Sequence, residues 1–216
     1  MPPKDDIRIL LVDDHAMVRE ALSRILGESP RIKVAGQAGD GRSALKMARE
    51  LRPDMVVMDY SMPGMDALDI LARLRQDHPK IKVLILTVHD NPHYAIKSLQ
   101  AGAHGFVIKS AAVRELVAAI TAVHTGGLYV PPELSDKVFN HLWGTSKRRV
   151  GVEALTQREF TLLRCLGSGK SLKECARCLG ISGSATATYR SRLLGKLELE
   201  NTGEIIRFAL ENRLVV

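Results

Sequence analysis

The chain has 216 residues, of which 45% are hydrophobic, and carries a formal net charge of +7. This length suits a medium-sized domain joined to a small one, and the apolar content allows a sizeable core. Apolar runs are only a few residues long and the N-terminus has no apolar signal region, which argues against a membrane span and favours a cytoplasmic protein. Residues 1–130 hold 17 basic and 15 acidic side chains, whereas residues 131–216 hold 14 and 9. The basic C-terminal segment is compatible with nucleic acid, and equally with a solvated basic surface.

Strands and helices are expected to alternate through the first 125 residues. The expected strands cover residues 7–12, 32–35, 54–59, 81–87 and 105–109. The expected helices cover residues 15–28, 40–51, 66–78, 92–101 and 111–124. The first helix carries a stripe of apolar residues at helical spacing: Met17, Val18, Ala21, Leu22, Ile25 and Leu26. Five strand–helix units in succession predict a doubly wound parallel sheet with right-handed crossovers.

Polar side chains stand at the carboxyl ends of four expected strands. These are Asp13 and Asp14, then Asp59, Thr87 and Lys109. Any one of them could be a capping or surface residue, but the carboxyl ends of parallel strands share one edge of a sheet, where such folds place their chemistry. Clustered Asp oxygens suit Mg²⁺, and an Asp oxygen can attack a phosphoryl donor while an ammonium neutralises the transferring oxygens. The set therefore predicts phosphoryl transfer to a carboxylate.

The same residues lie in motifs that resemble the receiver domain of bacterial two-component response regulators. The matching stretches are Val12-Asp13-Asp14-His15, residues 58–66 (MDYSMPGMD), Leu86-Thr87 and residues 102–109 (GAHGFVIK). The resemblance implies a flavodoxin-like α/β fold with strand order 2-1-3-4-5. It also implies the following roles: Asp59 as phosphoacceptor; Asp13, Asp14, Asp59 and the Ser61 carbonyl as Mg²⁺ ligands; Thr87 and Lys109 as phosphate-holding residues; and Phe106 as an aromatic switch. We expect this domain to cover residues 1–127.

A linker is expected over residues 128–150. Within it, Pro132 can open a short helix that runs to Trp143. The basic run Ser146-Lys147-Arg148-Arg149 is expected to be an exposed tether.

Residues 151–216 are expected to form a small all-α domain of four short helices. Its helix starts are marked by polar capping residues, namely Thr156 with Glu159, Ser171 with Glu174, Ser182, and Asn201 with Glu204. The Leu179-Gly180 turn between two of these helices is typical of a helix-turn-helix. The helix after Ser182 would then enter a DNA groove.

This segment resembles the LuxR-type helix-turn-helix domain of the NarL/FixJ subfamily, through residues 155–159, 173–176, 179–182 and 189–197. The resemblance implies DNA contacts from Lys173, Ser182, Ser184, Ala187, Thr188, Arg190, Ser191, Arg192 and Lys196. Four positions depart from the pattern: Ala185-Thr186 stands where Thr-Val is usual, Cys175 replaces an aliphatic residue, and Gly195 lies inside a helix. These departures bear on packing and DNA affinity rather than on the fold.

The whole chain is thus interpreted as a response regulator with no enzymatic activity of its own. A sensor histidine kinase would phosphorylate it, and phosphorylation would favour a homodimer that binds double-stranded promoter DNA, with no membrane partner. One alternative is an Asp-nucleophile phosphatase of the haloacid dehalogenase class. That class needs Asp-x-Asp at the end of the first strand and usually a cap domain, whereas this chain has adjacent Asp13-Asp14 there and no room for a cap. Another is a receiver whose degenerate output domain binds protein rather than DNA.

The three cysteines, Cys165, Cys175 and Cys178, are an odd number and do not suggest a disulfide framework. Cys175 and Cys178 form a C-x-x-C pair on an expected helix, which leaves a redox or zinc role open. Three thiols cannot fill a Cys₄ zinc site, and buried cysteine often acts as a small hydrophobic residue.

Overall fold

The computed structural model describes residues 6–110, 113–143 and 151–215. The chain divides into two compact units, residues 1–142 and 143–216, each with its own internal contacts. The start of the expected fifth helix, residues 111–112, and the basic run at 146–149 lie outside the described residues. Among the described helices, none is long and apolar enough to cross a membrane.

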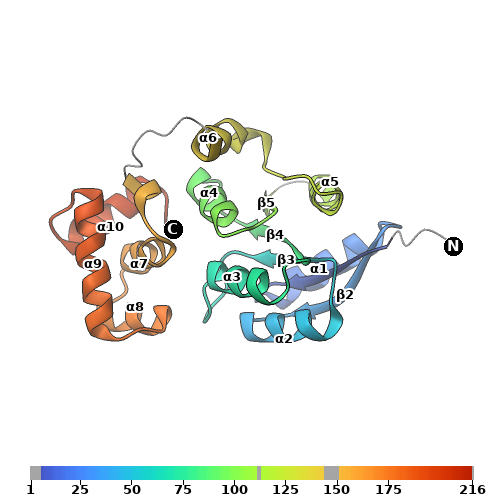
Figure 1. Ribbon diagram of the computed structural model, residues 1–216, viewed down its shortest axis with the longest axis horizontal. Coiled ribbons are helices and arrows are strands. Elements are labelled where there is room, and N and C mark those ends of the chain that lie inside the picture. The colour runs from blue at the N-terminus through green and yellow to red at the C-terminus, as the bar shows by residue number, and fades with distance from the viewer. Residues whose placement is uncertain (1–5, 111–112, 144–150, 216) are drawn as a thin grey trace. The chain divides into compact units, whose positions relative to one another are not determined.

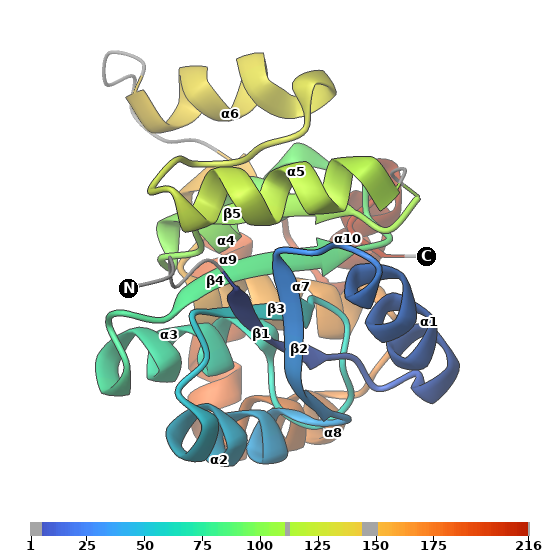
Figure 2. The same ribbon diagram turned by 90° about the vertical axis from the view of Figure 1, so that its right-hand side faces the viewer.

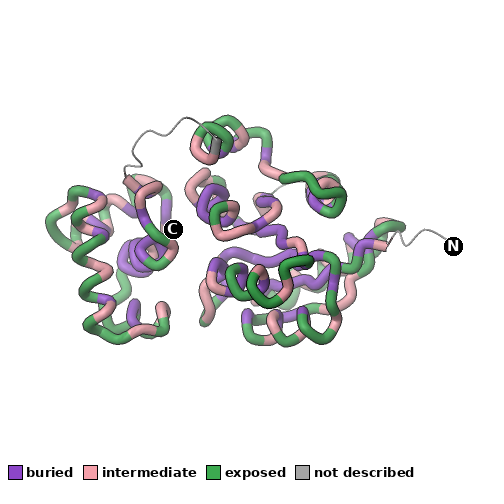
Figure 3. Tube along the Cα trace, in the orientation of Figure 1, coloured by how far each residue is buried: buried purple, intermediate pink, exposed green. Residues whose placement is uncertain are grey.

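The first unit is built on a parallel sheet of five strands (Figure 1). The strands are β1 Ile7–Val12, β2 Ile32–Ala38, β3 Met55–Asp59, β4 Lys82–Thr87 and β5 Gly105–Ile108. Their order is β2-β1-β3-β4-β5, which confirms the expected topology. Every residue of β3 is buried, as its run of apolar residues predicts for a central strand covered on both faces (Figure 3).

Helices cover both faces of this sheet. They are α1 Ala16–Gly27, α2 Gly41–Leu51, α3 Ala67–Asp77, α4 Pro92–Gln100 and α5 Val113–His124, and a further helix, α6 Pro132–Trp143, follows them in the chain. Side chains of α1 and α5, including Leu26 and Ile120, share one core with Ile9, Val57 and Leu84 of the strands. Figure 2 shows α1 and α5 on that face, and α2 and α3 on the other.

The apolar stripe expected on α1 faces the core only in part. Leu26 is fully buried and Leu22 packs against the core, but the Met17 side chain is 87% exposed and Val18 is 37% exposed. The helix α1 lies over β1 and the edge strand β2, so part of its apolar stripe has no strand beneath it.

Tyr129 and α6 extend the first unit beyond the expected sheet. The backbone N–H of Phe106 donates to the Tyr129 carbonyl at 2.9 Å, and the Tyr129 N–H donates to the His104 carbonyl at 3.2 Å. The Tyr129 hydroxyl donates to Glu115 at 2.9 Å, and Val138 of α6 is fully buried. The segment after α5 is therefore tied to the edge of β5.

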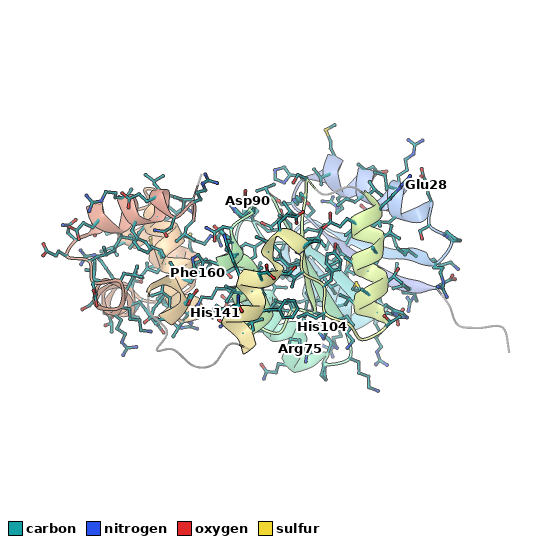
Figure 4. All side chains as sticks on the ribbon, turned by 90° about the horizontal axis from the view of Figure 1, so that it is seen from above. Glu28, Arg75, Asp90, His104, His141 and Phe160 are labelled. Atoms are coloured by element: carbon teal, nitrogen blue, oxygen red, sulfur yellow. The ribbon has the colours of Figure 1, made fainter. Side chains whose placement is uncertain are left out.

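His104, just before β5, is held as a neutral imidazole. Its Nδ1 accepts a hydrogen bond from the Val83 backbone N–H at 3.1 Å, and Arg75 Nη1 lies 3.5 Å from its Nε2 (Figure 4). Burial, together with the positive charges of Lys82 and Arg75, lowers the pKa of His104 to about 4. A proton on this ring would cost the hydrogen bond to Val83.

We expect His104 to make the stability of the first unit depend on pH. The unfolded histidine takes up a proton near pH 6.5 while the folded one resists it down to about 4, so unfolding becomes easier as pH falls through this window. Because His104 is partly exposed to solvent, we expect the free energy of unfolding to fall by about 1 kcal/mol between about pH 7 and pH 5. Denaturant titrations of the wild type and His104→Asn at both pH values measure it. An equal pH dependence in the two proteins would contradict this role.

The second unit is a cluster of short helices. They are the 3₁₀ turn η1 Gly151–Ala154, then α7 Gln157–Gly167, α8 Leu172–Leu179, α9 Gly183–Leu197 and α10 Thr202–Glu211. Both capping boxes form, at Thr156 with Glu159 and at Ser171 with Glu174. Gly180 ends α8 in the left-handed conformation (φ 63°), which turns the chain into α9.

Two of the departures from the family pattern are accommodated in this unit. Thr186 is fully buried, and its hydroxyl donates to the Ser182 carbonyl at 2.9 Å, so the buried oxygen is satisfied. Cys175 is fully buried in an aliphatic position. The helix α9 continues through the exposed Gly195 to Leu197.

Candidate functional site

The strand ends of the first unit bring the expected acidic site together. Asp13 follows β1, Asp59 ends β3, Thr87 ends β4 and Lys109 follows β5. Asp13 and Asp59 are each 2% exposed and Thr87 is fully buried. Because β1, β3, β4 and β5 are neighbours in one parallel sheet, residues more than 90 positions apart in the chain meet at one edge.

Lys109 joins the two buried carboxylates. Its Nζ lies 2.7 Å from Asp13 Oδ2 and 2.9 Å from Asp59 Oδ2. Burial by itself lowers the pKa of Lys109, but the hydrogen bonds to Asp13 and Asp59 outweigh it, and the pKa is raised. The ammonium therefore stays charged at neutral pH and balances one of the negative charges at the site.

The remaining negative charge suits a divalent cation. Asp13, Asp14, His15 and Asp59 each offer a ligand atom, and these atoms lie within 4.8 Å of one another. The Oδ1 atom of Asp14 is buried and accepts no hydrogen bond from the described residues, although the exposed His15 ring lies 3.0 Å away. A desolvated carboxylate oxygen of this kind is a ligand that Mg²⁺ prefers. The residues present thus fit a hard cation.

His15 and Arg19 support the site, although the sequence motifs assigned them no role. The His15 backbone N–H donates to Asp13 Oδ1 at 2.8 Å, and Arg19 Nη1 donates to the Asp13 carbonyl at 2.6 Å. Arg19 lies on α1 one helical turn after the N-cap His15, and this spacing is a sequence signal that could have identified Arg19 as a neighbour of the site.

His89 is a second residue that sequence reasoning missed. Its backbone N–H donates to the Thr87 hydroxyl at 3.1 Å, and its ring Nε2 lies 3.3 Å from the Ser61 hydroxyl. The ring stacks on Tyr94 of α4, with centroids 4.2 Å apart and planes 6° apart. The available signal was its position, since Ser61 and His89 each stand two residues beyond a polar strand end.

Ser61 and Phe106 complete the expected set. The Ser61 backbone N–H donates to Asp59 Oδ1 at 3.2 Å, which places Ser61 at the site. Phe106, within β5, is fully buried and is paired in register with Ile85. The Phe106 ring is therefore buried in this structure, and its role as a switch stays a prediction.

In the second unit, α9 presents one exposed face. Ser184, Ala187, Thr188, Ser191 and Arg192 are all exposed and recur at helical spacing, while Thr186, Leu193 and Leu197 are buried on the other side. Ser182 caps the helix by accepting from the Ala185 N–H at 3.2 Å, and Lys173 is exposed on α8. Most of the expected DNA contacts thus share one accessible helix face.

Lys196 and Arg190 have partners inside this unit. Lys196 Nζ lies 2.6 Å from Glu159 Oε2, and it also donates to the Ala154 carbonyl at 3.0 Å. Burial alone raises the pKa of the Glu159 carboxyl, but the bonds from Lys196 and the Thr156 backbone outweigh it, and the pKa is lowered. Arg190 Nε donates to the Thr202 hydroxyl at 2.9 Å. Both cations hold α9 against neighbouring elements.

Comparisons with known proteins match both units. Residues 9–121 match the response regulator receiver domain family, and residues 153–209 match the luxR family of bacterial regulatory proteins. The transcriptional regulatory protein MctR of Rhizobium johnstonii is 35% identical over 215 residues, which cover 100% of this chain and 98% of that protein. The response regulator GacA of Pseudomonas viridiflava is 33% identical over 209 residues, which cover 97% of this chain and 98% of GacA.

Solved structures share part or all of this fold. A LuxR-family two-component response regulator from Aurantimonas aligns with a TM-score of 0.59 and 37% identity, over 62% of this chain and 95% of that one. RcsB of Salmonella typhimurium aligns with a TM-score of 0.77 over 96% of this chain and 98% of its own, and at 21% identity it shows the fold. Taken with the acidic edge of the sheet and the exposed α9 face, these matches place the chain in the family of transcriptional response regulators that join a receiver domain to a LuxR-type DNA-binding domain.

Proposed function

We propose that Asp59 accepts a phosphoryl group from a sensor histidine kinase and that this event controls promoter binding by the second unit. The observation that carries the proposal is the placement of Lys109, whose ammonium contacts Asp13 and Asp59 together at the buried edge of the sheet. A carboxylate without a function at this edge would not require a cation shared with a second buried carboxylate.

The two oxygens of Asp59 have different surroundings. Oδ1 accepts the Ser61 N–H, while Oδ2 is paired with Lys109. One carboxylate oxygen attacks phosphorus as the bond to the donor breaks, and Lys109 then neutralises the charge on the phosphoryl oxygens. Asp13, Asp14, Asp59 and the Ser61 carbonyl would hold Mg²⁺, which would supply further positive charge to those oxygens.

Thr87 can couple the phosphorylation of Asp59 to a change at α4. Its hydroxyl already holds the His89 backbone, and the His89 ring stacks on Tyr94. Tyr94 in turn packs edge-on against Tyr60, with centroids 4.8 Å apart and planes at 85°. When the Thr87 hydroxyl turns to a phosphoryl oxygen, it releases the His89 N–H, and the stacked rings must readjust. We propose this route in addition to the switch role that the family resemblance implies for Phe106.

Thr87→Ala should separate phosphorylation from its effect on DNA. With acetyl phosphate as donor, the variant should still be labelled, yet its affinity for a promoter fragment should stay at the resting value. In the wild type we expect phosphorylation to increase the affinity for the promoter fragment by a factor between several-fold and about a hundredfold, the usual range for coupled sites. Thr87→Ser, which keeps the hydroxyl, is the matched control and should respond like the wild type. A full DNA response in Thr87→Ala would refute the proposed role of the hydroxyl.

The exposed face of α9 would enter the major groove of DNA. Ala187, Thr188 and Ser191 are small and offer few hydrogen bonds, so one copy reads few bases. Two copies on half-sites about 10 bp apart would supply the missing specificity, which supports a homodimer as the active form. RcsB, which has the same fold, has been solved bound to promoter DNA in the presence of a phosphate mimic.

Arg192 should contribute affinity without sequence preference. It is an exposed cation on the α9 face, with its guanidinium 6.0 Å from the centre of the Tyr189 ring, and exposed arginines on such a face typically contact DNA phosphates. Arg192→Ala should weaken binding on all sequences and reduce the slope of log affinity against log salt by about one. Titrations of specific and random fragments at several salt concentrations measure both. A change in the preferred sequence would instead make Arg192 a base-reading residue.

A further inference from the structure

Three basic side chains gather at the end of the sheet that lies away from Asp59. Lys82 begins β4, His104 directly precedes β5, and Arg75 lies in the last turn of α3. Because β4 and β5 are parallel neighbours, their first residues lie at the same edge of the sheet. This edge is opposite to the one that carries the acidic site, so the three residues take no part in the phosphoryl chemistry proposed above.

The hydrogen bonds of His104 fix the position of its ring proton. The Val83 backbone N–H can only donate, so His104 Nδ1, 3.1 Å away, is the acceptor and carries no proton. The pKa of His104 is about 4, so the ring is neutral at pH 7 and its proton is on Nε2. Arg75 Nη1 lies 3.5 Å from this Nε2, and a guanidinium has no acceptor (Figure 4). Two hydrogen-bond donors therefore face each other, and an anion is the species that both can bind.

The Arg75 side chain is held in place by its own surroundings. Its Nη1 donates to the Pro79 carbonyl at 3.0 Å. Its Cγ and Nε atoms lie 3.1 and 3.2 Å from the place that a Cβ atom would take at Gly102, so the side chain passes closely over this glycine. The guanidinium thus has a set orientation beside His104, and it has five N–H groups with which to bind a ligand.

Among the described residues, no acidic side chain balances the charge of this group. Burial is the largest cause of the lowered pKa of His104, and the positive charges of Lys82 and Arg75 lower it further. Neither Arg75 nor Lys82 forms an ion pair with a described carboxylate, in contrast to Lys109 and Lys196. The surplus of positive charge and of donors excludes a metal ion here and favours an anion.

We propose that Arg75, His104 and Lys82 bind a phosphate group, either as free phosphate or on a small metabolite. One phosphate oxygen about 2.8 Å from both Arg75 Nη1 and His104 Nε2 would accept from each, and a nitrogen separation of 3.5 Å allows this. The other oxygens would receive a second guanidinium N–H and the charge of Lys82. A tetrahedral anion suits donors that come from three elements, whereas a planar carboxylate suits the guanidinium fork alone.

The tautomer of His104 is the first test. Long-range ¹H–¹⁵N NMR spectra of the full chain at pH 7 report which ring nitrogen carries the proton. The His104 signals are identified as those missing from His104→Asn, since the chain has 7 histidines. We expect the proton on Nε2. A proton on Nδ1 would overturn the proposal, because Nε2 would then accept from Arg75 and the two donors would no longer face each other.

Inorganic phosphate is the probe in the second test. It is titrated into the full chain without Mg²⁺ at constant ionic strength, with chloride as the anion that it replaces. We expect a saturable shift of the His104 Nε2 signal with a dissociation constant in the millimolar range. Arg75→Met should weaken this binding by about tenfold or more, because it removes charge-assisted hydrogen bonds. Arg73→Met removes the same charge from an exposed position of α3 and should bind like the wild type.

Two outcomes of this titration would overturn the proposal. One is a shift that grows linearly with phosphate and does not saturate, and the other is equal binding by Arg75→Met and the wild type. Circular dichroism checks that Arg75→Met is folded, and if it is not, the wild-type titration alone decides. Adenosine monophosphate, titrated in the same way, distinguishes the two sources of the phosphate group. Binding several-fold tighter than that of phosphate indicates a metabolite, and weaker binding indicates free phosphate.

Discussion

Asp59→Asn should abolish phosphorylation completely. In the presence of Mg²⁺ and acetyl phosphate, the wild type should gain one phosphoryl group that hydroxylamine releases, as expected for an acyl phosphate. The variant should gain none, because an amide oxygen is not a nucleophile toward phosphorus. The change should leave the fold intact, since Lys109 keeps its 2.7 Å contact with Asp13. Intact-protein mass spectrometry over a time course measures the gain.

Asp54→Asn is the matched control for this experiment. Asp54 immediately precedes the same strand at its opposite end, where its carboxylate accepts the Arg8 N–H at 2.8 Å, so it carries the same charge change away from the acidic site. It should be labelled at the wild-type rate. Labelling of Asp59→Asn to the wild-type level would show that another residue is the phosphoacceptor.

Lys196→Met should destabilise the second unit rather than simply weaken its contact with DNA. Glu159 is 2% exposed on its side chain, and Lys196 is its cationic partner. Removing one member of a buried pair leaves an uncompensated charge, and with Lys196 one-third exposed we expect a loss of about 2 kcal/mol. For a unit of this size that lowers the melting temperature by roughly 10 °C. Thermal unfolding followed by circular dichroism measures it.

Two further variants define the origin of that loss. Glu159→Gln combined with Lys196→Met removes both charges, and should be less destabilised than Lys196→Met alone. Lys173→Met removes a charge from an exposed position on α8 and should leave the melting temperature unchanged. If Lys196→Met kept the wild-type melting temperature but lost DNA affinity, Lys196 would be a DNA contact, as the sequence motif predicts.

The Glu159 pair also predicts a dependence of stability on pH. Because the pKa of the Glu159 carboxyl is lowered on folding, its contribution is present above the pKa of the unfolded carboxyl and is lost as the pH falls through the folded value. The free energy of unfolding of the second unit should therefore fall less at acidic pH in the Glu159→Gln/Lys196→Met protein than in the wild type.

The sequence by itself determined the order of strands and helices and the residues at the strand ends. This was possible because buried parallel strands, capping boxes and helix-ending glycines are local signals that tertiary contacts rarely override. Four consecutive apolar residues stand directly before Asp13, Asp59 and Thr87, so each polar residue marks the carboxyl end of its strand.

Only the tertiary structure decided what the side chains contact. Lys196 stands in the helix that carries the DNA motif, and nothing in its sequence neighbourhood reveals a buried carboxylate 37 positions away. In the same way, Met17 belongs to an apolar stripe, yet it is exposed because α1 lies at the edge of the sheet. His89 acquires its partner Ser61 through packing between segments that are distant in the chain. Such contacts depend on how helices and strands fit together, and the spacing of residues along one element does not encode that fit.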